Sequence, residues 1–326
     1  MASDPFSLDG KTIYVAGHKG MVGSALVRRL AGEGCELLTR ERAELDLTDG
    51  PRVRAFMTTH RPDAVVLAAA KVGGILANAS APATFLAQNL AIQQAVINAA
   101  FEAGVRRLVF VSSSAVYPRN APQPMAEDAL LTGPLEPTHE GYAIAKIAGM
   151  KLCSALRTQH GADYFAVTPT NLYGPKDNFD PQSSHVVAGM LRRAHEAKLS
   201  GSASLTIWGS GSPRREFLHV DDCADAIVHL LKAYSGEGHL NIGTGEDLTI
   251  GDLAERVAAC VGFSGEIVTD PSKPDGPPRK LLNVDRLRAT GWRPKIALTD
   301  GLSATYEWFL RAAASGGSGT GQHAVA

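Results

Sequence analysis

A glycine-rich turn between a strand and a helix constrains this chain more than any other feature of its sequence. Thr12 to Ala16 form a β-branched, apolar run that predicts a buried strand, and a helical pattern covers 24–31. Between them, Gly17, Gly20 and Gly23 follow the spacing G-x-x-G-x-x-G. Glycines in such a turn allow a sharp reversal and a close approach of the backbone to a pyrophosphate, whose charge the helix N-terminus favours. This stretch therefore predicts a dinucleotide-binding loop at the start of an α/β fold.

The segments that follow alternate between strands and helices. The sequence predicts strands at 35–38, 63–67, 107–111 and 164–168, and helices at 50–59, 82–103 and 141–160. Continuous apolar strands separated by helices indicate a parallel sheet that is covered on both faces. We therefore expect an α/β fold, in which a doubly wound parallel (Rossmann) sheet is followed by a smaller mixed α/β domain that binds the substrate.

Beyond Pro175 the predicted elements become shorter and less regular. Short strands are expected at 205–208, 216–218 and 266–268, and helices near 185–197, 220–232, 249–261 and 298–313. The predicted organisation is a cofactor-binding Rossmann domain over 1–175 with return segments near 215–245, and a mainly substrate-binding domain over 176–313. The tail at 314–326 is rich in Gly and Ser and is predicted to be disordered.

Composition excludes several classes of partner. The net charge is -1 and no basic run stands out, so we expect no binding to nucleic acid or to an anionic membrane. Residues 1–8 lack the apolar segment of a secretory signal, and no stretch approaches the ~20 apolar residues of a membrane span, which predicts a cytoplasmic protein. The four cysteines, Cys35, Cys153, Cys223 and Cys260, lack metal-ligand spacing, so we expect reduced, mostly buried thiols and no metal site.

A tyrosine and a lysine open the helix predicted at 141–160. Tyr142 and Lys146 are four residues apart and therefore share one helical face. An ammonium beside a phenol favours the phenolate, so we expect the pKa of Tyr142 to be lowered. Ser113 follows the strand at 107–111 and can hold the same substrate oxygen as the phenol. Together these three side chains predict a site that reduces a carbonyl or oxidises an alcohol with a nicotinamide cofactor.

The choice of cofactor is expected to depend on the end of the second strand. A basic side chain there accommodates a 2′-phosphate, whereas an acidic one binds the ribose hydroxyl. Arg40 and Arg42 lie at this place and Lys19 lies in the glycine loop, while Glu41 and Glu44 carry the opposite charge. The basic residues favour NADP(H) over NAD.

These features resemble the extended short-chain dehydrogenase/reductase family, and longer motifs resemble its GDP-L-fucose synthase branch. The motifs cover nearly the whole chain, from Lys11 to about Phe309, and they are GHKGMVGSA (17–25), AAAKVGGI (68–75), YAIAKIAG (142–149), PTNLYGP (169–175), DNF (177–179), REFLHVDD (215–222) and KPDG (273–276). The resemblance implies an NADPH-dependent homodimer that epimerises C3 and C5 of GDP-4-keto-6-deoxy-D-mannose and then reduces C4 to give GDP-L-fucose.

The resemblance also implies roles for particular residues. The catalytic group would be Ser113, Tyr142, Lys146 and His185, the last of which matches the family's Ser-His-Val motif. The cofactor-binding residues would be Gly17, Lys19, Gly20, Met21, Val22, Gly23, Arg40, Arg42, Ala69, Lys146, Pro169, Asn171 and Leu172. Local charge and the resemblance together assign the GDP-sugar to Asn171, His185, Arg193, Trp208, Arg215 and Lys280.

One expected acid/base residue is missing. The family carries a Cys just after the serine of the fourth strand, and alignment on Tyr117-Pro118 places Ala115 at that position. A methyl group cannot transfer a proton, and the unactivated hydroxyl of Ser114 is too weak a base to replace the thiol. Three explanations stay open: a substitution made to trap a complex, a homologue that only reduces, or slow epimerisation by His185 and water.

The resulting prediction is an NADPH-dependent epimerase-reductase, impaired in epimerisation if Ala115 is the native residue. The alternatives are a C4 ketoreductase of a GDP-sugar and, from another class, a non-catalytic NADP-binding sensor. Intact Ser113, Tyr142 and Lys146 argue against the sensor. A sugar-nucleotide dehydratase is disfavoured, because no acidic residue follows the strand-four serine.

Overall fold

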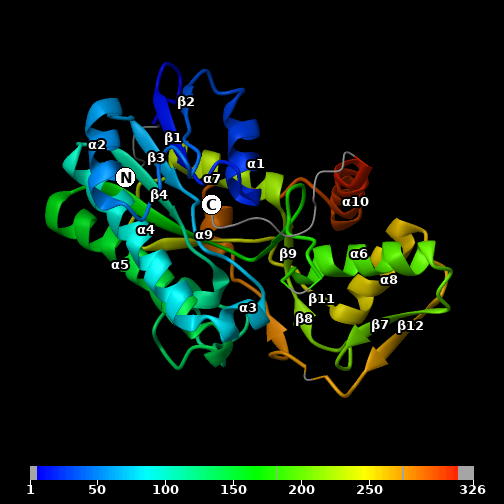
Figure 1. Cartoon of the computed structure of the whole chain (residues 1–326). Helices are drawn as coiled ribbons and strands as arrows, with labels where there is room; N and C mark the ends of the chain where they lie inside the picture. Colours follow the sequence, from blue (N-terminus) through cyan, green and yellow to red (C-terminus); the bar gives the residue numbers. More distant parts are fainter. Residues whose placement is uncertain (1–5, 182, 274, 315–326) are drawn as a thin grey trace.

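A six-stranded parallel sheet forms the centre of the fold (Figure 1). The structure is a computed structural model that describes residues 6–181, 183–273 and 275–314. The strands lie in the order β10-β5-β4-β3-β1-β2. Their bounds are β1 Thr12–Ala16, β2 Glu36–Leu38, β3 Ala64–Leu67, β4 Arg107–Val111, β5 Asp163–Pro169 and β10 His239–Ile242. The predicted doubly wound α/β fold is thereby confirmed.

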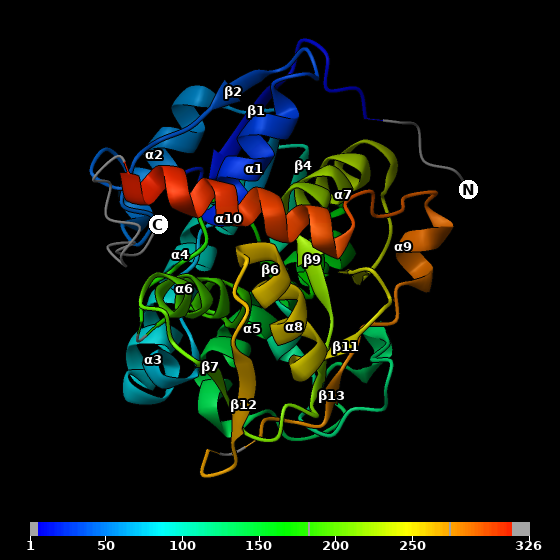
Figure 2. The same cartoon turned by 90° about the vertical axis from the view of Figure 1, so that its right-hand side faces the viewer.

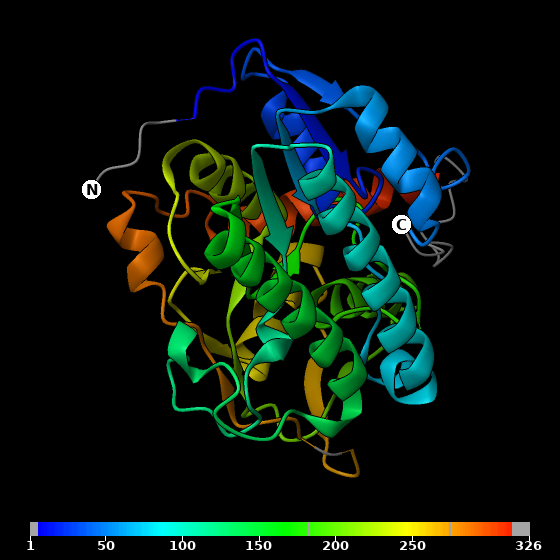
Figure 3. The same ribbon diagram turned by 90° about the vertical axis from the view of Figure 1, so that its left-hand side faces the viewer.

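Helices cover both faces of this sheet, because its strands carry apolar side chains on both sides. One face packs against α2 (Gly50–His60), α4 (Pro82–Glu102) and α5 (Glu140–His160), and Figure 3 shows α4 and α5 side by side there. The other face packs against α1 (Met21–Leu30) and α7 (Val220–Ala233). Each face therefore has its own hydrophobic core.

A third apolar cluster lies apart from the sheet. It joins α6 (Val186–Leu199), β7 (Ser204–Trp208), α8 (Ile250–Val261) and α10 (Leu298–Ala314), and β7 pairs with β12 (Glu266–Asp270). Figure 2 shows α10 running across the middle of the molecule, above α6 and α8 in that view, and Tyr306 of α10 contacts His195 of α6 at 2.8 Å. The predicted division into domains at 1–175 and 176–313 stays a prediction.

Short elements connect these parts. They are α3 (Ile75–Ser80), η1 (Ser114–Val116), η2 (Glu127–Ala129), η3 (Pro137–His139), β6 (Asn171–Tyr173), β8 (Arg214–Arg215), β9 (Phe217–His219), β11 (Leu248–Thr249), β13 (Arg279–Lys280) and α9 (Asp285–Ala289). Strand β6 pairs with β9, and β8 lies between β11 and β13. None of the described helices is both long enough and apolar enough to cross a membrane.

Two sequence-based boundaries were wrong, and one strand of the central sheet was not predicted. Helix α1 begins at Met21 rather than at residue 24, so the last part of the glycine motif is helical. Ala314, which was predicted to belong to the disordered tail, is the last residue of α10, and 315–326 lie outside the described residues. Strand β10 was not predicted as a strand. It carries the buried polar residues His239 and Asn241, which interrupt the apolar pattern of a core strand.

Candidate active site

Four loops meet at the carboxyl edge of the sheet. Gly17 follows β1, Ala69 lies just beyond β3, Ser113 lies just beyond β4, and Pro169 ends β5 beside Ile242 of β10. Gly17 has a φ of +86°, and a Cβ built on it would lie only 2.7 Å from the backbone N and Cα of Ala69. A side chain at position 17 would therefore separate two of these loops, which explains why glycine is needed there.

The glycine loop fits a dinucleotide pyrophosphate. Gly20 caps α1 without a side-chain hydrogen bond, and the first turn of α1 contains no acidic residue. The N–H groups of Met21, Val22 and Gly23 cannot have partners within the helix, so they are available to an anion. A Cβ on Gly23 would lie 2.0 Å from the carbonyl oxygen of Gly17, so this close approach of helix to loop also requires glycine.

The basic residues expected near the ribose already have contacts. Lys19 Nζ lies 2.5 Å from Glu41 Oε1, and both side chains are about half exposed. The Arg40 guanidinium lies over the Phe56 ring, 5.4 Å from its centroid, and Arg42 pairs with Asp46. The three basic side chains therefore contact Glu41, Phe56 and Asp46 in this structure.

Two further residues assigned to the cofactor lie on β6. Asn171 Nδ2 donates to the carbonyl oxygen of Glu216 at 2.8 Å, and Leu172 pairs with Leu218 of β9. Glu216 is fully buried, and its carboxylate accepts from the backbone N–H groups of Gly245 and Leu282. The Glu216 carboxylate follows Arg215 in the chain and links the segments around Gly245 and Leu282.

Ser113, Tyr142 and Lys146 lie together beyond β4. Ser113 caps η1, and its Oγ accepts a hydrogen bond from the N–H of Ala115 at 3.2 Å. Tyr142 and Lys146 lie in the first two turns of α5. Lys146 is only 2% exposed, and its Nζ donates to the carbonyl oxygen of Val111 at 2.8 Å.

The pKa of Tyr142 moves in the direction opposite to the one predicted. Burial raises the pKa of Tyr142 to about 12, and the neighbouring Ser113 hydroxyl only partly opposes this rise. Burial also lowers the pKa of Lys146 to about 7. The ammonium binds Val111 and lies 6.0 Å from the centroid of the Tyr142 ring, so it does not offset the burial of the phenol. The prediction of a lowered tyrosine pKa was therefore wrong.

His185 is paired with a carboxylate that sequence reasoning did not single out. His185 is the N-cap of α6, and its Nδ1 lies 3.5 Å from Asp177 Oδ1. The hydrogen bond and charge of Asp177 raise the pKa of His185, although burial opposes the rise. Asp177 belongs to the DNF motif, but nothing in the sequence indicates that its side chain faces His185. This pairing favours the imidazolium, the form that can donate a proton.

We expect Asp177→Asn to lower the pKa of His185. The amide keeps the size of the side chain but removes the negative charge, so the imidazolium would lose its proton at lower pH than before. An NMR titration of the His185 ring measures this shift directly, with the other histidines as internal controls. Any acid-catalysed step of His185 should slow about threefold to tenfold at neutral pH, a modest factor because the side chain is 45% exposed. An unchanged or higher titration midpoint would contradict the pairing.

Two of the predicted substrate-binding cations are neighbours. Lys280 of β13 lies opposite Arg215 of β8 in a parallel pair. Burial lowers the pKa of Lys280, and the charge of Arg215 lowers it further, while Glu136 opposes both. Bringing two cations together in a partly buried place has an electrostatic cost that a bound anion would relieve.

The other predicted nucleotide contacts lie around β7. Arg193 of α6 donates to the carbonyl oxygen of Thr206 at 2.9 Å, and burial lowers its pKa. Trp208 is 61% exposed, and Lys273 lies over its ring at 5.7 Å from the centroid. An exposed indole is available to stack on a planar ligand.

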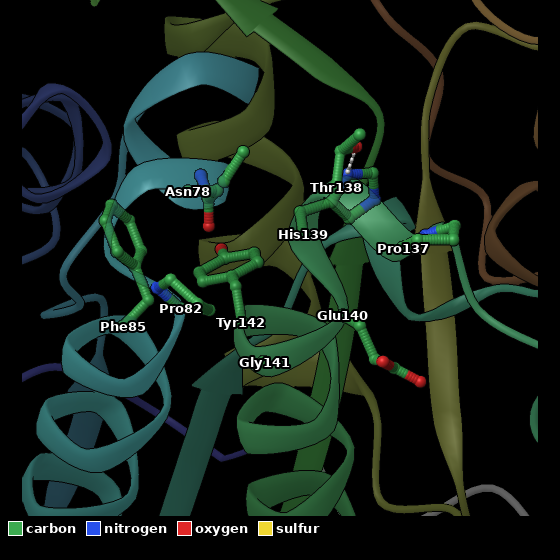
Figure 4. Close-up of a pocket in the computed structure, with 10 residues that line it drawn as sticks. Asn78, Pro82, Phe85, Pro137, Thr138, His139, Glu140, Gly141 and Tyr142 are labelled. Atoms are coloured by element: carbon green, nitrogen blue, oxygen red, sulfur yellow. Dashed lines mark hydrogen bonds between the residues drawn. The ribbon is translucent and has the colours of Figure 1, made fainter.

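A pocket opens beside Tyr142 (Figure 4). Residues from α3, α4, η3 and α5 line it, among them Asn78, Phe85, His139 and Tyr142. Sequence reasoning did not single out Asn78 or His139, because neither belongs to a spacing pattern that indicates chemistry. Among the described residues, no group of three or more His, Cys, Asp or Glu side chains could hold a metal ion.

Comparison with known proteins identifies the class to which this fold and site belong. The chain belongs to the NAD dependent epimerase/dehydratase family, whose model matches residues 13–243. Within this family it is similar to the GDP-L-fucose synthase of Sinorhizobium fredii, with 56% identity over 94% of this chain and 97% of that protein. The resemblance inferred from the motifs is thereby confirmed.

Two solved structures resemble the chain along almost its whole length. A GDP-mannoheptose C4 reductase from Campylobacter jejuni with NADP bound has a TM-score of 0.84 and 37% identity, covering 92% of this chain and 98% of that one. A GDP-L-fucose synthetase from Naegleria fowleri bound to NADP has a TM-score of 0.87 and 25% identity, covering 97% and 99%. The chain is therefore similar both to synthases and to a protein named as a reductase alone.

Proposed function

We propose that this chain converts GDP-4-keto-6-deoxy-D-mannose to GDP-L-fucose by epimerising C3 and C5 and reducing C4 with NADPH. The observation that carries the proposal is 56% identity with a GDP-L-fucose synthase over 94% of this chain and 97% of the relative. The position of Ser113 and Tyr142 beyond β4 supports it, because ligands of such sheets bind beyond the carboxyl ends of the strands.

The reduction step uses Ser113 and Tyr142. Both hydroxyls hold the C4 oxygen of the sugar, and bound NADPH supplies the hydride to C4. Because the pKa of Tyr142 is raised to about 12, its phenol keeps its proton near neutral pH and can donate it to the C4 oxygen as negative charge develops there. Lys146, in the next turn of α5, would contact the ribose of the bound cofactor.

The epimerisation steps use the same oxygen but a different pair of proton-transfer groups. Removing the hydrogen at C3 or C5 gives an enolate, whose oxygen Ser113 and Tyr142 stabilise. His185, with its pKa raised by Asp177, supplies a proton on one face of the ring. Proton removal on the other face of the sugar ring needs a base, and the methyl side chain of Ala115 cannot accept a proton. We therefore propose that epimerisation limits the overall rate.

The GDP part of the substrate is assigned to the cations away from the sheet. Arg215 and Lys280 would bind the pyrophosphate, Arg193 would add a further positive charge, and Trp208 would stack on the base. The neighbouring positions of Arg215 and Lys280 on paired strands support this assignment.

The cofactor is proposed to be NADPH rather than NADH. Arg40 and Arg42 lie in the loop after β2, and Lys19 of the glycine loop contacts Glu41 of that loop, so a 2′-phosphate would lie near these cations. We expect kcat/KM for NADPH to exceed that for NADH by about tenfold to a hundredfold, as charge-assisted hydrogen bonds to one phosphate allow. Arg40→Ala should reduce this ratio mainly through the NADPH value, as steady-state kinetics with each cofactor would measure. An equal loss with NADH would contradict the assignment of Arg40 to the phosphate.

A C4 ketoreductase without epimerase activity is the second candidate. Ala115 favours it, as does the similarity to a GDP-mannoheptose C4 reductase. Product NMR after incubation with the keto sugar and NADPH distinguishes the two functions. GDP-L-fucose supports the first proposal, whereas a C4-reduced sugar with unchanged C3 and C5 supports the second. No NADPH oxidation with a GDP-keto sugar would contradict both and leave an NADP-binding sensor. The homodimer and the cytoplasmic location stay predictions.

A further inference from the structure

The serine turn, residues 112–117, is anchored at both of its ends. At its start, the N–H of Ser112 donates to the carbonyl oxygen of Val167 of β5 at 2.8 Å. Within it, the carbonyl oxygen of Ser113 accepts from the N–H of Val116 at 3.1 Å. At its end, Tyr117 caps η1 and is only 3% exposed. The place of Ser113 therefore depends on both anchors.

The Tyr117 hydroxyl contacts two buried polar side chains of β10. It lies 2.5 Å from Asn241 Oδ1 and 2.9 Å from His239 Nε2, and these two residues are 0% and 6% exposed. Asn241 Nδ2 donates to the carbonyl oxygens of Met125 and Asn283 at 2.9 and 3.0 Å, which determines the orientation of the amide. Asn241 Oδ1 is therefore an acceptor, and the phenol donates to it.

The direction of the second contact follows from the first. Because the Tyr117 proton points to Asn241, a lone pair of the phenol oxygen faces His239. Burial lowers the pKa of His239 to about 4, so the ring is neutral near pH 7 and carries its single proton on Nε2 to make this hydrogen bond. The phenol thus donates once and accepts once, and removing its hydroxyl would leave two buried polar atoms without this partner.

The same asparagine is connected to the strand that carries Lys280. Beyond β13, the carbonyl oxygen of Leu281 accepts from the N–H of Met125 at 2.7 Å, and the N–H of Asn283 donates to the carbonyl oxygen of Met125 at 2.8 Å. Asn241 Nδ2 binds both Met125 and Asn283, as described above. Asn241 therefore joins the serine turn to the segment that follows Lys280.

We infer that the Tyr117 hydroxyl is a positioning group for Ser113. Asn241 links this hydroxyl to the segment after Lys280, so the serine keeps a fixed place relative to that strand. The inference rests on the proposed function, in which Ser113 holds the C4 oxygen and Lys280 binds the pyrophosphate of the same substrate. A misplacement of about 1 Å can slow a reaction about a hundredfold, so this spacing matters for the rate.

Tyr117→Phe tests the inference, because it removes only the hydroxyl. The hydrogen bonds of Asn241 Nδ2 stay, so the strand of Lys280 should keep its place while the serine turn loses an anchor. We expect kcat for NADPH oxidation with GDP-4-keto-6-deoxy-D-mannose to fall about tenfold to a hundredfold. The Kd values for GDP and for NADPH, each measured by calorimetry, should stay within about twofold of those of the unchanged chain.

Tyr164→Phe is the matched control for the loss of a buried phenol hydroxyl. Tyr164 is 1% exposed, and its hydroxyl donates to the carbonyl oxygen of Val105 at 3.1 Å. Val105 precedes β4, whereas Ser113 follows it, so this hydrogen bond lies at the opposite edge of the sheet. The control should lower the midpoint of thermal unfolding but keep kcat.

Two variants of His239 test the inference if Tyr117→Phe does not fold. His239→Leu removes one of the two partners of the phenol and should lower kcat about twofold to tenfold. His239→Gln keeps an N–H donor and should retain most of the rate. Equal kcat values in these two variants would contradict a role of the hydrogen bond.

Other outcomes would also overturn the inference. One is a kcat in Tyr117→Phe that equals the value of the unchanged chain, and another is an equal loss of kcat in Tyr164→Phe. Weaker binding of GDP in Tyr117→Phe would show that the substrate site is disrupted rather than its spacing to Ser113. No turnover of the keto sugar by the unchanged chain would instead overturn the proposed function, and the inference with it.

Discussion

Replacing Tyr142 with Phe is expected to lower the rate of sugar-dependent NADPH oxidation by about 10²- to 10⁴-fold, the usual contribution of a general acid. The phenol is the group that lies beside Ser113 and keeps its proton near neutral pH, since burial raises its pKa to about 12. Phenylalanine fills nearly the same volume, so the loop beyond β4 and the cofactor site should persist. Stopped-flow measurement of NADPH oxidation reports the step directly.

The affinity for NADPH distinguishes loss of the proton donor from loss of the cofactor-binding site. Fluorescence titration should give nearly the same Kd for NADPH in the Tyr142→Phe variant as in the unchanged chain. Tyr306→Phe serves as a matched control, because it removes a phenol hydroxyl from α10 whose partner is His195 of α6 and should not change the rate. A loss of less than about fivefold in the Tyr142 variant would show that another group, such as water, delivers the proton.

The second large effect is expected from Ala115→Cys. A thiol at this place supplies the acid/base group that the second face of the sugar lacks, so exchange of the C3 and C5 hydrogens should accelerate by about 10²- to 10⁴-fold. Incubation with the keto sugar in D2O, followed by NMR, measures deuterium entry at each carbon without requiring reduction. The product should shift toward GDP-L-fucose when NADPH is then added.

Ala115→Ser is the natural control for this experiment. Serine adds one polar atom at the same place, but an unactivated hydroxyl is too weak a base, so exchange should stay close to that of the unchanged chain. Rapid deuterium entry at C3 and C5 in the unchanged chain would contradict slow epimerisation. Such a result would indicate that His185 and water suffice.

The central sheet could be predicted because the residue patterns that specify most of its strands and turns are local in the sequence. The run from Thr12 to Ala16 and the glycines behind it specify a strand and a turn without reference to any distant residue. Strand β10 was not predicted because the polar residues His239 and Asn241 are typical of loops. In the folded chain the buried hydroxyl of Tyr117 lies 2.9 Å from His239 Nε2 and donates to Asn241 Oδ1 at 2.5 Å. Polar strands of this kind are specified by long-range contacts.

The candidate site divides in the same way. Ser113, Tyr142 and Lys146 were predicted from motif and spacing, but the pKa of Tyr142 was not, since burial depends on the surrounding structure. Asp177 could not be assigned from the sequence, because its contact with His185 spans a loop without a regular period. Asn78 and His139 were missed for a related reason. Whether a buried polar atom has a hydrogen-bond partner among the described residues can be seen only in the folded chain.

The hydrogen bond from the N–H of Ala115 to Ser113 Oγ has an evolutionary consequence. It comes from the backbone, so every residue at 115 except proline can provide it, and Ser113 Oγ keeps this contact. Substitutions at 115 other than proline are therefore expected to keep this hydrogen bond. Under the proposed function, a single codon change at 115 would therefore alter epimerisation while Ser113 keeps its backbone contact.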